Sequence, residues 1–230
     1  MESGKVSSRS FKDKKKTFQG YLSRIKPFIQ RGRLLDIGCA TGELLDVFQE
    51  SSFDVYGVEI SSEGVKKCVE KFGENKIIGR ALKKRDFHNS FFDIITLSDV
   101  FEHQVNPNGL INIIVDILKP GGFLMIVTPD TSSISNKLMR MNWPHYKVEH
   151  LFYYNRLNII ALLADSFDPV IMSSAYKTLT LKYCSNILKA YSKNRFTLIV
   201  ARLIDSLPQK IQFCAFVIKA GEMFVLLRKK

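Results

Sequence analysis

The stretch LLDIGCATGELL, residues 34–45, is the feature of this sequence that most restricts how the chain folds. An apolar run typical of a buried strand passes into a helix through a junction that holds two glycines and several small residues. A strand-to-helix turn of this composition lets the backbone approach something bulky, most often a nucleotide-like ligand. The junction therefore predicts an α/β domain with a ligand site where its first strand ends.

Strands and helices are expected to alternate around this junction. A short packed helix is predicted over 17–29, because apolar residues recur there at helical spacing. Beyond it, the sequence predicts strands over 33–38, 53–60, 76–82, 91–100 and 123–129, and helices over 42–51, 61–73 and 106–122. Such alternation favours βαβ units and a mostly parallel sheet with helices on both faces.

The pattern changes after residue 130. A long polar and aromatic connection, 130–154, is expected to form a lid or substrate wall, because loops of this length are usually functional. A helix over 155–166, a strand over 168–175, a helical insert over about 176–212 and a last strand over 222–229 complete the expected single domain, 17–230. The insert is interpreted as a cover on the sheet, a dimer contact or an amphipathic surface against anionic lipid.

The composition excludes several classes of protein. No apolar run approaches the roughly 18 residues that a membrane span needs, and the first residues lack the apolar stretch of a signal peptide. Four scattered cysteines without a CxxC pair (Cys39, Cys68, Cys184 and Cys214) favour reduced thiols over a disulfide framework or zinc site. A cytoplasmic protein is therefore expected.

The net charge of +12 is concentrated at the two ends of the chain. Residues 1–33 hold ten Lys and Arg against two Asp and Glu, residues 34–174 hold 13 against 18, and residues 175–230 hold 11 against two. Residues 1–16 are expected to be a basic, flexible segment. The basic flanks indicate either solubilising charge or an anionic partner such as a membrane surface, a phosphorylated substrate or, less favoured, nucleic acid.

The glycine junction departs from the dinucleotide-binding fingerprint G-x-G-x-x-G. Counted from Gly38, the fingerprint positions fall on Gly38, Ala40 and Glu43, so the third glycine is missing and hydride transfer is disfavoured. The pattern present, D-x-G-x-A-x-G from Asp36 to Gly42, resembles motif I of class I S-adenosylmethionine (SAM)-dependent methyltransferases. That resemblance implies SAM as the methyl donor and S-adenosylhomocysteine as the product.

The resemblance continues in order along residues 33–130. Glu59 matches the acidic residue that holds the ribose hydroxyls in this family, and the stretches 91–103 and 118–129 resemble the family's fourth- and fifth-strand motifs. It implies a Rossmann-like fold with a seven-stranded sheet. The implied cofactor-binding residues are Asp36, Gly38, Cys39, Ala40, Gly42, Glu59, Ile60, Ser98 and Asp99. The partner of the adenine amino group stays open, since Asp86 reaches it only if its loop bends back.

Two further stretches, SDVFEH and NWPHYKVEHLFYY, resemble a broad bacterial subgroup of these enzymes. The subgroup includes quinone-biosynthesis O-methyltransferases and many enzymes of sugar and cell-surface glycan pathways. His103, with Glu102 and His150 beside it, is the candidate base for a hydroxyl acceptor, because a base helps when the acceptor has a high pKa. Capping and packing are the alternative role for His103.

The same stretches offer a metal site and a substrate wall. Asp99, Glu102, His103 and His150 could form an oxygen and nitrogen site, since related metal-using methyltransferases have a similar E-x-x-E-H, although a divalent metal is not expected. The candidate substrate-binding residues are Trp143, His145 and Tyr153, whereas Tyr154 is assigned to packing.

The leading hypothesis is a SAM-dependent methyltransferase that acts on a hydroxyl oxygen of a small molecule, a sugar or glycan, or a lipid-linked precursor. An RNA methyltransferase or nucleic-acid binder using the basic flanks is the second hypothesis, although the sequence shows no RNA-binding module. A non-catalytic methyltransferase-fold partner subunit is the third. The acceptor and the oligomeric state stay undetermined at this point.

Overall fold

The computed structural model describes residues 2–191 and 195–230. Seven strands form one sheet in the order β3-β2-β1-β4-β5-β7-β6, and only β7 runs against its neighbours. The strands are β1 (Gly32–Ile37), β2 (Phe53–Val58), β3 (Ile77–Ile78), β4 (Phe92–Ser98), β5 (Leu118–Pro129), β6 (Phe167–Thr180) and β7 (Ala215–Lys229). The predicted mostly parallel, seven-stranded sheet is confirmed.

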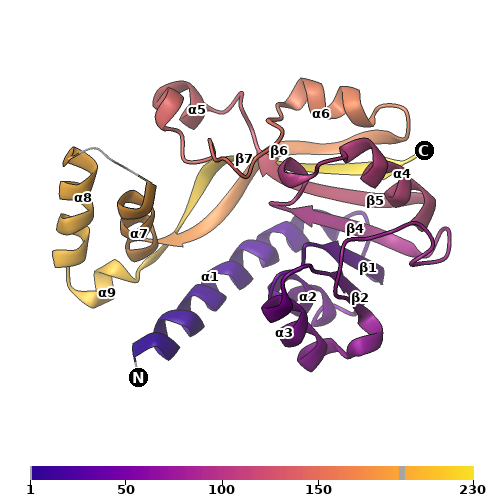
Figure 1. The fold of residues 1–230 in the computed structure, drawn as a ribbon, viewed down its shortest axis with the longest axis horizontal. Coiled ribbons are helices and arrows are strands. Elements are labelled where there is room, and N and C mark those ends of the chain that lie inside the picture. Colours follow the sequence, from indigo (N-terminus) through magenta and orange to yellow (C-terminus); the bar gives the residue numbers. More distant parts are fainter. Residues whose placement is uncertain (1, 192–194) are drawn as a thin grey trace.

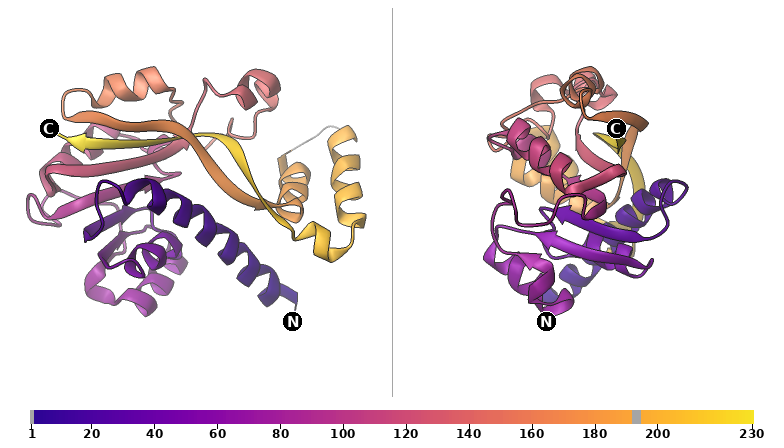
Figure 2. Two further views of the ribbon diagram at one scale, coloured as in Figure 1. Left: turned by 180° about the vertical axis from the view of Figure 1, so that it is seen from behind. Right: turned by 90° about the vertical axis from the view of Figure 1, so that its right-hand side faces the viewer.

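Helices cover both faces of the sheet, as Figures 1 and 2 show. On one face α1 (Glu2–Ile25), α2 (Glu43–Gln49) and α3 (Ser62–Phe72) enclose a hydrophobic core. On the other face α4 (Pro107–Ile117) and α6 (Arg156–Leu163) enclose a second core. Successive strand residues such as Leu34 and Leu35 enter opposite cores, because side chains alternate along a strand.

Helix α1 begins at Glu2, so residues 2–16 of the segment expected to be flexible have a helical backbone in the structure. The segment continues the helix because it contains no proline and is rich in lysine, which has a good helix propensity. The apolar residues Tyr21, Leu22 and Ile25 anchor the last turns of the helix in the core.

Strands β6 and β7 continue beyond the sheet as a two-stranded ribbon, which pairs Tyr176 with Lys219 and Thr180 with Ala215. Helices α7 (Leu181–Tyr191), α8 (Arg195–Ser206) and α9 (Gln209–Gln212) stand at the end of this ribbon. We call residues 176–219 the arm. Figures 1 and 2 show the arm reaching away from the sheet, so the helical insert is not the cover on the sheet that was one of our expectations.

The last strand begins seven residues before the predicted start, because the Ala220-Gly221 pair forms a bulge instead of ending the strand. Gly221 has φ +83, and the pairing with β6 shifts between Ser174 and Tyr176. A glycine bulge of this kind bends a strand pair without ending it.

Short elements complete the chain: the 3₁₀ turns η1 (Glu74–Lys76), η2 (Phe101–His103) and η3 (Arg140–Asn142), and helix α5 (Ile134–Met139). Helix α4 ends at Ile117, so the Lys-Pro-Gly-Gly sequence begins β5 instead of lying in the predicted helix. Among the described residues, no helix combines the length and apolar character needed to cross the membrane.

Candidate active site

The glycine junction forms a left-handed turn between β1 and α2. Gly38, Ala40 and Gly42 have φ values of 80°, 48° and 84°. A Cβ atom on Gly38 would lie 2.3 Å from Val100 Cγ2, and one on Gly42 would lie 2.6 Å from Phe72 Cε2. Glycine is therefore required at both positions by conformation and by space.

A cavity of about 530 Å³ lies against this turn, at the carboxyl ends of β1 and β4. Its volume falls within the roughly 300–1,000 Å³ of small-molecule sites. Its position is where ligands bind in open parallel sheets. Six of the nine predicted cofactor-binding residues line it: Asp36, Gly38, Cys39, Ala40, Ser98 and Asp99. The sequence therefore located the cavity.

Most of the rest of the cavity lining comes from α1 and the arm, which were not predicted to contact the cofactor. Phe18 and Tyr21 of α1, Lys177 of β6 and Tyr183 of α7 line the cavity, together with Phe213 after α9. Thr178 N–H donates to Thr17 Oγ1 at 2.9 Å, which fastens α1 to the ribbon of the arm. The cavity is thus enclosed between the sheet, α1 and the arm.

Asp36 lies at the base of the cavity and is almost completely buried. Its Oδ1 accepts a hydrogen bond from Thr96 Oγ1 at 2.6 Å. Burial raises the pKa of Asp36 to about 7, although the hydrogen bond from Thr96 opposes this rise. Near neutral pH the side chain therefore exchanges between a neutral and a charged form.

Glu59, Ile60 and Gly42 do not line the cavity. Glu59 Oε2 accepts the Ala40 N–H at 2.7 Å, and its Oε1 accepts the N–H groups of Ile60 and Ser61 at 2.9 and 2.8 Å. The carboxylate thereby fastens the glycine turn to the end of β2. Three of its roughly four acceptor positions are used, so one is left for a further donor.

The loop that holds Asp86 is closed on itself. Asp86 accepts two hydrogen bonds of 2.7 Å from the Arg80 guanidinium and one of 2.8 Å from Lys83 N–H. These bonds hold the pKa of Asp86 below its usual range, mainly through Arg80. The loop does not bend back toward the cavity, so this arrangement offers no support for Asp86 as the adenine partner.

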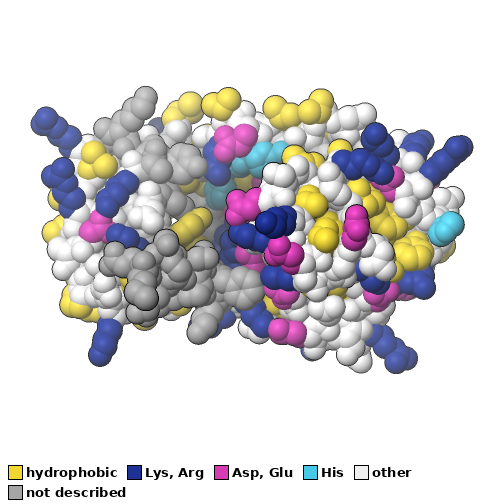
Figure 3. Space-filling view, turned by 60° about the horizontal axis from the view of Figure 1, so that its bottom comes forward, with side chains coloured by type: hydrophobic (Ala, Val, Ile, Leu, Met, Phe, Trp, Pro, Cys, Tyr) yellow, Lys and Arg dark blue, Asp and Glu magenta, His cyan; other side chains and the backbone are white. Residues whose placement is uncertain are grey.

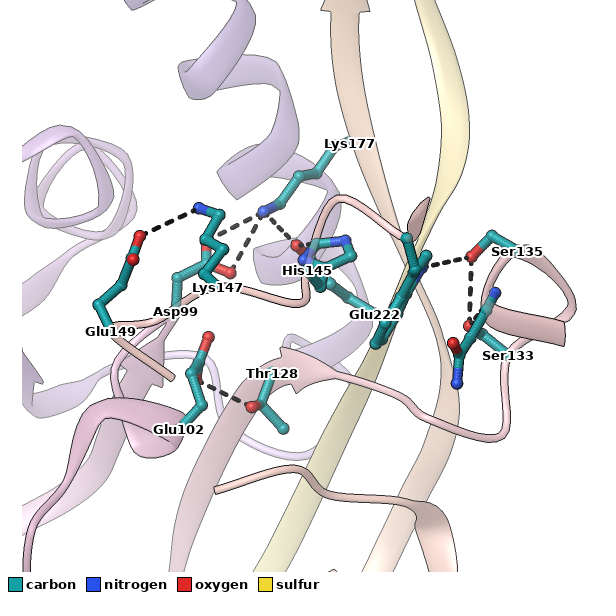
Figure 4. A network of polar contacts seen from close by, with 12 residues as sticks. Asp99, Glu102, Thr128, Ser133, Ser135, His145, Lys147, Glu149, Lys177 and Glu222 are labelled. Atoms are coloured by element: carbon teal, nitrogen blue, oxygen red, sulfur yellow. Dashed lines mark hydrogen bonds and ion pairs between the residues drawn. The ribbon is translucent and has the colours of Figure 1, made fainter. Parts of the chain in front are cut away.

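A cluster of charged side chains joins the sheet to the arm beside the cavity (Figure 4). Lys177 Nζ lies 2.6 Å from Glu222 Oε1 and 3.1 Å from Asp99 Oδ2. His145 Nε2 lies 3.7 Å from the same Glu222 oxygen. Glu222 Oε2 and the Tyr21 hydroxyl are buried and have no hydrogen-bond partner among the described residues. Sequence reasoning named Asp99 and His145 but missed Lys177 and Glu222.

The charges of this cluster depend on one another. Burial raises the pKa of Glu222 to about 8, and the charge of Asp99 adds to this effect while Lys177 opposes it. Desolvation at the wall disfavours the charged forms of Asp99 and Lys177, but their mutual attraction outweighs it. This attraction holds the pKa of Asp99 below its usual value and the pKa of Lys177 well above its usual value.

Glu102, His103 and His150 come together as expected, with one ligand atom from each lying within 4.8 Å of the others. His103 Nδ1 lies 2.8 Å from the Glu149 carbonyl oxygen, and a carbonyl can only accept, so Nδ1 donates and Nε2 is left to accept. Glu102 Oε2 accepts from Thr128 Oγ1 at 2.8 Å. His150 Nδ1 is buried without a partner among the described residues.

This group is chemically suited to bind a proton or a cation. Burial raises the pKa of Glu102, with the charge of Asp99 adding to it, while burial and the neighbouring His103 lower the pKa of His150. Asp99 is not part of the group, because its carboxylate pairs with Lys177. The group lies outside the lining of the cavity described above.

Two aromatic residues of the 130–154 connection, Trp143 and Tyr154, are buried and serve packing. Trp143 is buried, donates from Nε1 to Ser135 Oγ at 3.1 Å and packs on Gly221, where a Cβ would lie 3.0 Å from Nε1. Tyr154 is buried against Phe101, in agreement with its assignment to packing. Tyr153 is exposed, and its hydroxyl donates to the Lys147 carbonyl. Of the three predicted substrate contacts, only His145 reaches the charged cluster.

Comparison with known proteins identifies the family. A family model described as a methyltransferase domain matches residues 11–166, which is more than half of the chain. The chain belongs to this family. The match ends before β6, so it does not extend over β6, the arm or β7 of this chain.

Relatives and solved structures agree with this assignment. The chain is 27% identical to ubiquinone biosynthesis O-methyltransferase of Shewanella halifaxensis over 113 residues, 47% of this chain and 48% of that protein. It is 30% identical to the protein of the same name from Shewanella pealeana over 101 residues, 42% and 43% of the two chains. The chain thus spans about half the length of these curated relatives.

The fold of this methyltransferase-family chain is shared by solved structures. A SAM-dependent methyltransferase from Archaeoglobus fulgidus superimposes with a TM-score of 0.62 at 18% identity, over 98% of each chain. The predicted Rossmann-like methyltransferase fold is confirmed.

The residues around the cavity fit SAM. SAM carries a positive sulfonium and ammonium, which suit the carboxylates of Asp36, Glu43 and Asp99 in the lining. Its carboxylate suits a lysine, and its adenine and ribose need the apolar surface that Phe18 and Leu44 offer. The left-handed turn allows backbone contact with such a molecule.

Proposed function

We propose that this chain is a methyltransferase that moves a methyl group from SAM to a hydroxyl oxygen of a small-molecule acceptor. The single observation that carries the proposal is the left-handed turn of Gly38, Ala40 and Gly42 on the wall of the cavity. The family match and the relatives named as O-methyltransferases support it.

The cofactor would be held by the residues at the ends of β1 and β4. Asp36, Gly38, Ala40, Ser98 and Asp99 would contact it from the cavity wall. Glu59 would use its remaining acceptor position toward the ribose hydroxyls after a shift of the turn that it holds. When bound, SAM supplies an electrophilic methyl group on a positive sulfur.

The chain's own contribution is alignment and exclusion of water. The walls of sheet, α1 and arm would hold the acceptor oxygen in line with the methyl group, which is the main source of rate in such transfers. His103 Nε2 is the candidate base, since its Nδ1 is fixed by the Glu149 carbonyl. Glu102 and His150 would orient His103, and His145 would contact the acceptor near Glu222.

The test is transfer of a radiolabelled methyl group from SAM to a panel of phenols, diols, sugars and amines. Labelling of oxygen acceptors that falls about 100-fold or more in His103→Gln, with SAM binding unchanged, supports the proposal. The matched control is His88→Gln, outside the site. Labelling of amines alone, or equal rates in His103→Gln and wild type, would contradict the proposed acceptor or the proposed base.

A further inference from the structure

Helix α8 presents an apolar stripe to solvent at the end of the arm. Ile199 and Leu203 are 53% and 62% exposed, and Leu207 follows one turn later with 36% exposed. Ile199 and Leu203 are spaced by four, so they lie along one side of the helix, and Leu207 comes directly after the helix ends at Ser206. The opposite side is used for packing, since Ala201 is buried and its carbonyl accepts a hydrogen bond from Ser185 of α7.

Cationic side chains border this stripe. Arg195 and Arg202 are exposed and lie on the solvent side of α8, beside Ile199. Residues 181–219 contain seven Lys and Arg but only one acidic residue, Asp205. That carboxylate is bound by Lys182 at 2.8 Å and by Lys189. The face of α8 therefore carries positive charge without acidic residues to offset it.

The arm has further exposed apolar side chains outside α8. Ile211 in α9 and Val217 in β7 are exposed, with the exposed cations Lys210 and Lys219 near them in sequence. Figure 3 shows Lys and Arg side chains projecting from the arm, which forms the left-hand end of that view, while most acidic side chains lie toward the centre and right. We call Ile199, Leu203, Leu207, Arg195 and Arg202 the α8 face.

We propose that the α8 face docks the protein on an anionic phospholipid surface. A helix with an apolar stripe bordered by Lys and Arg lies in the interface of such a surface, with its apolar side chains among the acyl chains and its cations at the phosphates. The comparison that identifies the family ends at residue 166, so this surface belongs to a part of the chain that the family match leaves unassigned.

Other occupants fit the α8 face less well. In a two-fold dimer the same patch meets itself, so the arginines of two copies would be brought together at a cost in repulsion. RNA would use the cations, but its phosphates would leave Ile199, Leu203 and Leu207 in water. A phospholipid surface offers acyl chains to the apolar side chains of the α8 face and phosphates to its arginines.

Docking would also place the cavity near the membrane. Lys182, Tyr183 and Asn186 of α7 line the cavity from the arm, on the helix that packs against α8. The amino-terminal end of α1 lies on the same side of the molecule as the arm (Figures 1 and 2). An acceptor that partitions into the membrane would reach the cavity from there. This consequence rests on the proposed function, whereas the docking itself does not.

The test is co-flotation of the full chain with vesicles of phosphatidylcholine alone or mixed with phosphatidylglycerol, at low and high salt. We expect binding only to the mixed vesicles, weakened by salt. Arg195→Gln with Arg202→Gln should lower the partition coefficient roughly 30-fold. Ile199→Ser with Leu203→Ser should lower it about tenfold or more.

Matched controls keep these variants interpretable. Val148→Ser with Leu157→Ser removes two apolar side chains that are 98% and 84% exposed outside the arm, and should leave binding unchanged. Lys84→Gln with Arg85→Gln removes two exposed cations outside the arm and should likewise leave vesicle binding unchanged. Circular dichroism checks that each variant is folded.

Three results would overturn the docking proposal: no flotation of the wild type, equal flotation of all variants, or a dimer in solution that Ile199→Ser with Leu203→Ser dissociates. Binding of S-adenosylhomocysteine is measured separately, so that a failure of the docking proposal can be distinguished from a failure of the proposed function. A chain that floats with the vesicles but does not bind this product contradicts the proposed function and leaves the docking intact.

Discussion

Lys177 and Glu222 form an ion pair of 2.6 Å across the point where the arm leaves the sheet. Lys177 belongs to β6 and Glu222 follows the Gly221 bulge of β7. The lysine also reaches Asp99 at the end of β4, so one ammonium ties the arm to the edge of the sheet at the cavity wall. The cluster therefore couples the shape of the cavity to the position of the arm.

Replacing Lys177 by Met should lower the free energy of unfolding by about 2–3 kcal/mol, since it leaves a buried carboxylate without its partner. The loss stays below that of a fully buried pair because Lys177 is a quarter exposed. The loss should be larger at alkaline than at mildly acidic pH, where Glu222 takes up a proton. Urea unfolding at several pH values measures it.

The double variant Lys177→Met with Glu222→Gln shows whether the two residues act as a pair. We expect its loss in the free energy of unfolding to be smaller than the summed losses of the two single variants, by about 1 kcal/mol or more. Lys219→Met, an exposed lysine on the same ribbon, should change stability by less than about 0.5 kcal/mol. Additive losses would mean that the 2.6 Å contact does not contribute to stability.

Asp36 makes the stability depend on pH. Its pKa of about 7 in the folded chain lies above the ordinary aspartate pKa of 3.8, so folding favours its protonated form. Its contribution is complete below about pH 4 and is lost as the pH rises through about 7. Relative to Asp36→Asn, the wild type should lose stability in this window with a slope of up to about 1.4 kcal/mol per pH unit. Parallel urea titrations of both proteins check this, with Asp54→Asn, half exposed, as the control.

Two glycine substitutions should act in opposite directions. Gly38→Ala meets a φ of +80° and a contact of 2.3 Å to Val100, so we expect a loss of about 2–4 kcal/mol and of cofactor binding. Gly20 lies in α1 with no atom within 4 Å of its Cβ position, so Gly20→Ala should stabilise the chain by about 0.5–1 kcal/mol. Thermal unfolding compares them. Equal effects would argue against the described turn.

A divalent metal is not expected to take part in the reaction. His103 Nδ1 donates to the Glu149 carbonyl, so Nε2 keeps its lone pair and can take the proton of the acceptor directly, without a metal. Methyl transfer should therefore proceed at the same rate with and without a chelator. A rate that is lost with chelator and restored by Mg²⁺ or Mn²⁺ would instead make Glu102, His103 and His150 a metal site.

The central part of the fold was predictable because its signals are local. Alternating apolar strands and helices end at Gly, Pro or polar residues, and the glycine junction at residues 38–42 demands a left-handed turn. The arm was not predictable in the same way. Whether Ala220-Gly221 ends a strand or bends it depends on the pairing of β6 with β7, which involves residues about 50 positions apart in the chain.

The candidate site was predictable only where motifs bring residues together. Asp36, Gly38, Ser98 and Asp99 lie at or just after the carboxyl ends of β1 and β4, which pair with each other, so their meeting follows from the sheet order. Lys177 and Glu222 belong to no motif, and their role depends on the bulge. Trp143 was assigned to the substrate wall because of its place in the stretch that follows the fifth strand, yet it packs against Gly221, a contact that only the folded chain creates.

The most direct test of the proposed cofactor site is calorimetric titration of the full chain with S-adenosylhomocysteine and, separately, with NAD. We predict micromolar binding of S-adenosylhomocysteine and none of NAD. Glu59→Ala should weaken that binding about tenfold or more, since Glu59 holds the glycine turn and is the residue proposed to accept from the ribose hydroxyls. Glu63→Ala, a matched exposed glutamate on α3, should not change it. Absence of S-adenosylhomocysteine binding, or binding that is equal in Glu59→Ala, would contradict the cofactor site described here.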